Sequence, residues 1–96
     1  MSTQDAYRQK VEAEIELAQA KLIELKAHAK NVAADVRIKY EGMIDDLEQM
    51  LDTTKTKLRE LGSSTDGAWE DLKGGVEHTW GDFKSGLGKA ASKFKS

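Results

Sequence analysis

The sequence predicts an all-α fold in which a long helix forms an oligomeric coiled coil or bundle, followed by a linker and a shorter amphipathic helix. Two observations support this prediction. Apolar or small residues recur at every third or fourth position from Tyr7 to Leu61, and similar side chains recur every eleven positions near the C-terminus. Both spacings suit an α-helix of ~3.6 residues per turn. The chain also contains no proline, the residue that most often interrupts helices.

The first segment, residues 1–62, is expected to form one continuous helix over residues 4–61. Its apolar positions advance by about 3.6 residues on average, the period of a straight helix rather than of a strict left-handed coiled coil. Residues 2–5 supply capping oxygens at its start, and Gly62 suits its C-terminal end. The one interior glycine, Gly42, costs about 1 kcal/mol relative to alanine. The predicted helix is therefore long and weakly supercoiled.

A solitary helix of this length cannot bury its apolar side, so it must pack against another copy, fold back or lie against a partner. Another copy is favoured because residues 27–31 offer only one asparagine where a helical hairpin usually has glycine or proline. A fold-back near Asn31 or near Gly42 is the alternative. The predicted oligomer seam consists of Leu22, Leu25, Val36, Tyr40, Met43, Leu47 and Leu58.

Residues 63–67 are turn and capping residues without a large apolar side chain, so they are expected to be a linker. The last segment, residues 68–96, is predicted to be an amphipathic helix. Glu70 and Asp71 suit the positive dipole of its first turn. Its eleven-residue repeat forms a stripe for binding a surface or a partner, made of Trp69, Leu72, Lys73, Val76, Trp80, Phe83, Lys84, Leu87 and Phe94.

Glycine weakens this second helix. Five glycines between residues 74 and 88 cost about 4 to 5 kcal/mol relative to alanine. The isolated helix is therefore expected to be frayed and to fold on contact with whatever covers its stripe. Docking on the long helix as part of a bundle or oligomer is favoured over contact with a membrane surface. If the helix is accessory, proteolysis should cut first between Gly62 and Gly88 and leave a helical, oligomeric core.

Composition argues against an enzyme. A chain of 96 residues, one third of them charged and six of them aromatic, is too short and polar for a large core with an enclosed active site. His28 and His78 stand far apart, and the carboxylates around Asp45 and Asp46 suit a solvated helix face. No catalytic, cofactor-binding or metal-binding residue and no small-molecule substrate are expected. The net charge of −2 provides no field suited to nucleic acid.

A resemblance is carried by residues 68–73 (AWEDLK), 80–84 (WGDFK) and 92–94 (SKF). Together with the charged, alanine-rich helix before them, they resemble small bacterial coiled-coil proteins of uncharacterised function. The eleven-residue period is more weakly similar to exchangeable apolipoproteins and late-embryogenesis-abundant proteins, although the many glycines depart from the apolipoprotein pattern. The resemblance implies a cytoplasmic, all-helical bacterial protein associated with stress, with no catalytic residues.

The expected function is that of a non-enzymatic structural or interaction protein that self-associates through its helical seam. The alternative is a peripheral membrane-surface or stress-protective module that acts through the C-terminal helix. The alternative rests on the tryptophans and on four lysines after residue 83, which no acidic residue accompanies. Expected partners are thus a second copy and, in the alternative, an anionic membrane surface or a partner helix. The expected location is the cytoplasm, or the periphery of the inner membrane.

Overall fold

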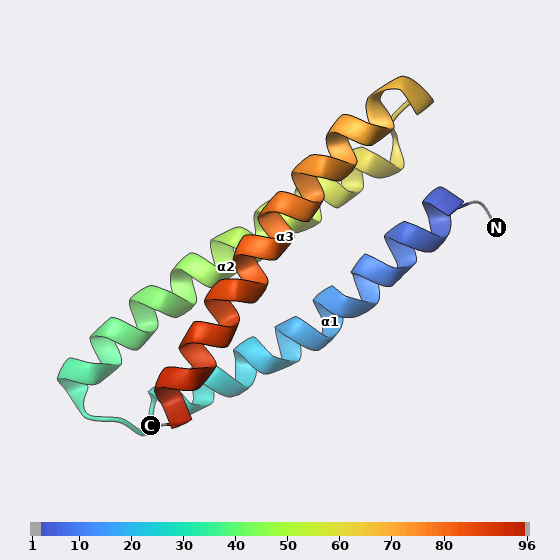
Figure 1. The fold of residues 1–96 in the computed structure, drawn as a ribbon. Coiled ribbons are helices and arrows are strands. Elements are labelled where there is room, and N and C mark those ends of the chain that lie inside the picture. The colour runs from blue at the N-terminus through green and yellow to red at the C-terminus, as the bar shows by residue number, and fades with distance from the viewer. Residues whose placement is uncertain (1–2, 96) are drawn as a thin grey trace.

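The computed structural model describes residues 3–95, with side chains described for residues 3–93, and consists of three helices (Figure 1). Helix α1 spans Thr3–Ala29, α2 spans Ala34–Gly62 and α3 spans Asp66–Lys95. None of the described residues forms a strand. The prediction of an all-α fold is therefore confirmed.

The prediction of one continuous helix over residues 4–61 is wrong, because the chain turns back at residues 30–33. The backbone N–H of Asn31 donates to the carbonyl of His28 at 3.0 Å, and the guanidinium of Arg37 donates to the carbonyl of Lys30 at 2.9 Å. The bend thus lies near Asn31 and not near Gly42. Packing explains it, since the turn lets α1 bury its leucines against the same chain, and such burial outweighs weak turn propensity.

The connection between α2 and α3 is shorter than the predicted linker of residues 63–67, because α3 already begins at Asp66. Helix α2 ends at Gly62, and the hydroxyl of Ser64 donates to the carbonyl of Leu61 at 2.8 Å. The backbone N–H of Trp69 donates to the carbonyl of Thr65 at 3.1 Å. This tight connection lays α3 antiparallel beside α2.

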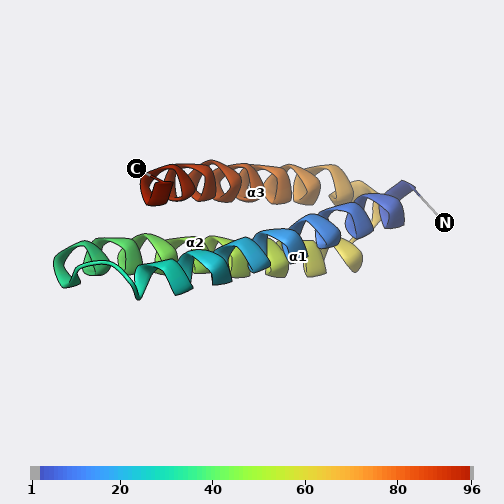
Figure 2. The same cartoon turned by 90° about the horizontal axis from the view of Figure 1, so that it is seen from below.

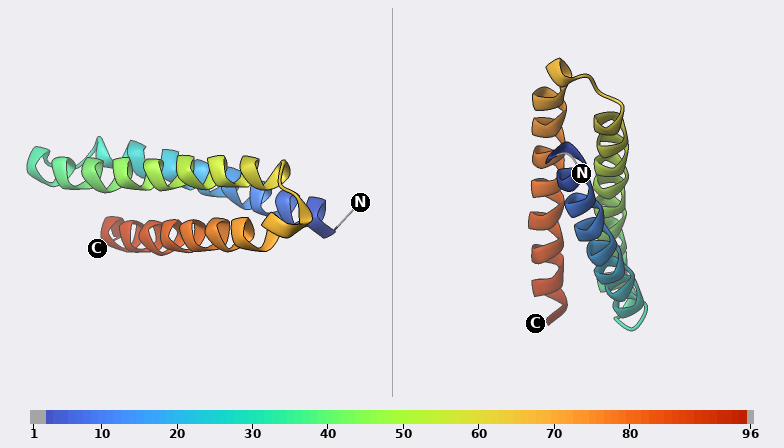
Figure 3. Two further views of the ribbon diagram at one scale, coloured as in Figure 1. Left: turned by 90° about the horizontal axis from the view of Figure 1, so that it is seen from above. Right: turned by 90° about the vertical axis from the view of Figure 1, so that its right-hand side faces the viewer.

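The helices form an elongated bundle of 50 × 20 × 17 Å. Seen from below, α1 and α2 form one layer, and α3 lies over this layer along the length of the bundle (Figure 2). The turn between α1 and α2 projects beyond the C-terminal end of α3 in the view from below. The view from above shows the same arrangement (Figure 3, left). The first turns of α2 are therefore not covered by α3.

Within each helix, buried residues recur at heptad spacing. Two series at seven-residue spacing run along α1 and two along α2, and a further series runs along α3. Heptads are the spacing of helices that wrap around each other with a left-handed supercoil. The buried residues are Val11, Ala18 and Leu25; Ile15, Leu22 and Ala29; Ile44, Leu51 and Leu58; Leu47, Thr54 and Leu61; and Trp69, Val76, Phe83 and Ala90, with Trp80 beside them.

Among the residues whose side chains are described, Thr54 is the polar exception in this core. Its side chain is fully buried, and its hydroxyl donates to the carbonyl of Met50 at 2.9 Å. A buried hydroxyl that lacks such a bond costs about 1 to 3 kcal/mol. The polar group is thus satisfied within its own helix, and the interior is otherwise filled by apolar side chains.

Candidate functional site

The stripe predicted on α3 is largely inside the bundle. Val76 and Phe83 are fully buried, Trp69 and Trp80 nearly so, and Leu72 and Leu87 pack partly buried against them. Lys84 is exposed, and the side chain of Phe94 lies outside the described residues. The stripe is therefore used for folding, as expected for a helix that docks within a bundle.

One aromatic contact joins α3 to α1, and a second lies within α3. The rings of Tyr7 and Trp69 meet edge to face with centroids 5.9 Å apart, and the ammonium of Lys73 lies 5.0 Å from the centroid of Tyr7. Farther along α3, the rings of Trp80 and Phe83 stack with centroids 5.2 Å apart. Such pairs add about 0.5–1.5 kcal/mol beyond the burial of their area. The edge lysines of the predicted stripe thus contact rings of the protein itself.

The residues of the predicted oligomer seam fall into two groups, which differ in burial. Leu22, Leu25, Leu47 and Leu58 are buried in the core of their own chain. The members on the first half of α2 are more accessible, since Val36 is 39% exposed and Tyr40 and Met43 are only partly buried. One part of the predicted seam is thus buried within the chain, and the other part is accessible.

We define the α2 strip as the accessible or partly buried residues Val36, Tyr40, Met43 and Met50, with the buried Leu47 between the last two. These residues are three or four positions apart, so they share one face of α2. The hydroxyl of Tyr40 donates to the carbonyl of Lys93 at 3.1 Å, which places Tyr40 level with the last turn of α3. Because the two helices are antiparallel, Val36 lies one turn beyond that level and α3 does not reach it.

An open groove of about 820 Å³ follows the α2 strip where α2 meets α3. Met43, Leu47 and Met50 give it an apolar floor, and Gly86 allows α3 to approach closely there. A side chain at Gly86 would place its Cβ 2.9 Å from Cδ2 of Leu47. The groove combines flexible methionine side chains, which adapt to varied surfaces, with charged side chains at its edge. The edge residues are Asp46, Lys89 and Lys93.

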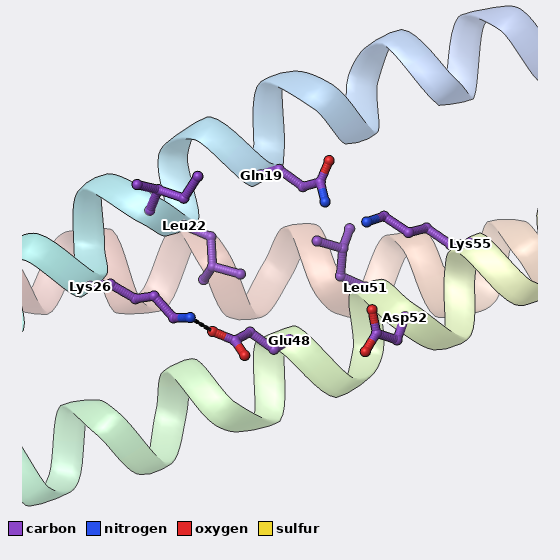
Figure 4. A pocket seen from close by; sticks show the side chains of 8 residues that line it. Gln19, Leu22, Lys26, Glu48, Leu51, Asp52 and Lys55 are labelled. Atoms are coloured by element: carbon purple, nitrogen blue, oxygen red, sulfur yellow. Dashed lines mark ion pairs between the residues drawn. The ribbon is translucent and has the colours of Figure 1, made fainter.

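A second, smaller cavity of about 210 Å³ lies between α1 and α2 (Figure 4). Lys26 reaches across it to form an ion pair with Glu48, and Leu22 and Leu51 line it from opposite helices. The hydrogen bond to Glu48 raises the pKa of Lys26, so this lysine stays charged and is unsuited to act as a base. The cavity is thus a contact between the two helices, with paired charges at its mouth.

The histidines give no metal site. The imidazole of His78 lies 3.5 Å from the carboxylate of Asp82 one turn along α3, and both side chains are well exposed. No three His, Asp or Glu side chains gather to hold a metal ion among the described residues. None of the described helices is both long and apolar enough to cross a bilayer.

Sequence reasoning missed Ile44 and Leu51, which are more deeply buried than their neighbours Met43, a predicted seam residue, and Met50. The heptad of Leu47, Thr54 and Leu61 could have indicated them.

Comparisons with models of protein families, with curated proteins and with solved structures find no match for this chain.

Proposed function

We propose that the protein is a non-enzymatic interaction module that associates with copies of itself through the α2 strip. The observation that supports this most directly is the position of Val36. It lies on the face of α2 that forms the core farther along, yet 39% of it is exposed, because α3 ends before reaching it. A second copy that covers this end of the strip would remove apolar surface from water on both chains.

The charges around the α2 strip suit a symmetric pair. The α3 edge of the groove carries Lys89 and Lys93, whereas its α2 edge carries Asp46. In an interface with twofold symmetry, each patch meets the same patch of the other copy. A patch that contains both signs can place the lysines of one copy against the carboxylate of the other. This charge pattern favours a second copy over a uniformly acidic or basic partner.

Contact of α3 with an anionic membrane has less support. Two features favour it, namely the lysines of the last turns and the indole N–H of Trp80, which is buried without a hydrogen-bond partner in the described part of the chain. However, the apolar side chains that would enter a bilayer surface are those that fill the core. Lipid contact would therefore require α3 to leave the bundle, whereas association through the α2 strip requires no such loss.

The proposal predicts that Val36→Glu weakens self-association. Sedimentation equilibrium of the wild-type protein, from micromolar to millimolar concentration, should show a mass that rises with concentration. A buried charge at each of two symmetric positions should lower the association constant at least about tenfold. Circular dichroism should show an unchanged helix content, because Val36 lies outside the buried core.

Ile38→Glu is the matched control. Ile38 is 72% exposed and lies about 200° around α2 from Val36, on the opposite side of the helix. The same change of charge and polarity at this position should leave the association constant unchanged. A wild-type protein that stays monomeric throughout would contradict the proposal, and so would equal effects of the two substitutions.

A further inference from the structure

We propose that the turn of residues 30–33 is a hinge, and that two copies of the chain associate by exchanging α1. In this form α1 and α2 of each copy run as one helix, and the α1 of each copy packs on the α2 of the other. The inference rests on the proposed self-association and specifies its form. Four features of the structure carry it: the chemistry of the turn, the phase of the apolar face, the pairing of α1 with α2, and the charges beside Arg37.

The turn has little of the chemistry that fixes a hairpin. It consists of Lys30, Asn31, Val32 and Ala33, and no described residue has a positive φ. Ala33 stands at the N-cap of α2, with φ −59° and ψ 149°, and provides no side-chain cap. Ala33 thus offers no side-chain acceptor to the first N–H groups of α2, whereas in a continuous helix the carbonyls of the preceding turn would accept them.

The apolar face keeps its phase across the turn. Ala29 and Leu47 are both buried, and the 18 residues between their positions correspond to five turns of ~3.6 residues. Val32, Val36 and Tyr40 fall between them at intervals of three or four residues. A straightened chain would therefore present one unbroken apolar face, and Val36, exposed in the hairpin, would lie within it.

The pairing of α1 with α2 locates the symmetry axis of such a dimer. Lys26 and Glu48 form an ion pair and lie eleven positions to either side of Arg37. Leu22 and Leu51 face the same cavity, and their midpoint is also next to Arg37. If a second copy supplies α2, the same pairing places the twofold axis beside Arg37. Val36 then meets the partner's Val36, and the exposed valine becomes the centre of the seam.

The charges near this axis are complementary on one side of the helix. Asp35 and Lys39 lie two positions to either side of Arg37 and are both exposed in the hairpin. In the exchanged dimer, Asp35 would face the partner's Lys39, and the pair would occur twice by symmetry. Arg37 would lie near the partner's Arg37, which opposes the dimer. In the hairpin its guanidinium instead donates to the carbonyl of Lys30 at 2.9 Å and holds the turn closed.

Substitutions at the hinge should shift the equilibrium between the closed monomer and the dimer with exchanged α1. Two of them should favour the monomer, and one should favour the dimer. Ala33→Pro fits the closed turn, because Ala33 has φ −59°, but it disrupts a continuous helix, so the dimer should weaken by about 100-fold or more. Ala33→Ser supplies an N-cap to the hairpin and should weaken the dimer about tenfold. Arg37→Ala removes the bond to Lys30 and the like charges at the axis, so it should strengthen the dimer. Sedimentation equilibrium measures all three, and thermal melting of the monomer shows whether Ala33→Pro still folds.

A cysteine pair reports directly which chain supplies α1. The wild type has no cysteine, so Lys26→Cys with Glu48→Cys places two thiols at an existing contact between α1 and α2. After refolding at high concentration, the dimer fraction is isolated and oxidised. A covalent dimer on a non-reducing gel is expected, and Lys26→Cys alone should give none, because the two Lys26 positions lie far from the axis.

The outcomes separate the two proposals. Disulfides within single chains, together with a dimer that Ala33→Pro, Ala33→Ser and Arg37→Ala do not change, would overturn the exchange of α1 and leave association through the α2 strip intact. A wild-type protein that stays monomeric after refolding at millimolar concentration would overturn both.

Discussion

At the scale of single residues, Tyr7 joins the start of α1 to the start of α3. Its ring meets Trp69 edge to face and lies beneath the ammonium of Lys73. Burial raises the pKa of the Tyr7 phenol, and the nearby carboxylate of Glu77 raises it further through its charge and a hydrogen bond. The folded state therefore holds this phenolic proton more tightly than the unfolded chain does.

A raised pKa at Tyr7 makes stability depend on alkaline pH. The contribution is complete below the pKa of an unfolded tyrosine, about 10, and is lost as the pH rises through the higher folded value. We expect the melting temperature to fall as the pH rises above the pKa of an unfolded tyrosine. This fall should be larger than the fall that deprotonation of lysines alone would cause. Thermal melting followed by circular dichroism over a series of alkaline buffers measures this.

Tyr7→Phe isolates the effect of the phenol, because it keeps the ring that meets Trp69 and leaves Tyr40 in place as the other tyrosine. The variant should lose less stability than the wild type over the same alkaline range. Identical alkaline losses in the two proteins would show that Tyr7 does not ionise differently on folding.

At the scale of elements, the glycines of α3 fall into two groups. A Cβ added at Gly81 would meet no neighbouring atom within 4 Å, whereas one added at Gly86 would lie 2.9 Å from Cδ2 of Leu47. Leu47 is 3% exposed, so its Cδ2 would have to shift within the core. Gly86 is thus required by the approach of α3 to α2, but Gly81 lowers helix stability without serving that contact.

The two glycines predict opposite effects of alanine. Gly81→Ala should stabilise the protein by about 0.5–1 kcal/mol, because alanine loses less backbone entropy in a helix. Gly86→Ala gains the same term but forces Leu47 aside, and overpacking of a core costs about 1–3 kcal/mol. Urea unfolding should therefore separate the two variants by at least about 1 kcal/mol. Equal stabilisation by both would contradict the close packing at Leu47.

The element boundaries show what the sequence could predict. The helical class, the end of α2 at Gly62 and the apolar stripe of α3 follow from local spacing and turn residues. The break at residues 30–33 does not, because these residues are compatible with a helix and the fold-back is stabilised by contacts distant in sequence. The predicted seam contained Met43 where the core uses its neighbour Ile44, because both positions suit a helical period of ~3.6 residues.

The missed turn at residues 30–33 also limited what the sequence could predict about the candidate site. Val36, Tyr40 and Met43 were predicted in an oligomer seam from their spacing alone, and that role is still a prediction. Their accessibility could not be derived from the sequence, because it depends on where α3 ends relative to α2, a relation shown by the bond from Tyr40 to Lys93. The groove beside them arises from the same relation.

At the scale of the whole molecule, α3 is part of the core and not an accessory tail. Trp69, Val76, Trp80 and Phe83 are buried against the hairpin of α1 and α2. Full burial of a large apolar side chain contributes roughly 1.5 to 3 kcal/mol, and four of them together approach the total stability of about 5–15 kcal/mol typical of a small domain. The expectation that proteolysis leaves a stable oligomeric fragment of residues 1–62 therefore conflicts with the packing.

Deletion of residues 63–96 should consequently abolish the cooperative fold. The remaining hairpin would expose Leu47 and the other α2 side chains that α3 covers, and two helices without a third bury too little surface to offset their conformational entropy. Circular dichroism at micromolar concentration should show much reduced helix content and no sharp thermal transition. Phe83→Ala in the full chain is the milder control, with an expected loss of about 3–5 kcal/mol. A monomeric fragment of residues 1–62 that melts cooperatively would show instead that α3 only docks on a hairpin that is stable by itself.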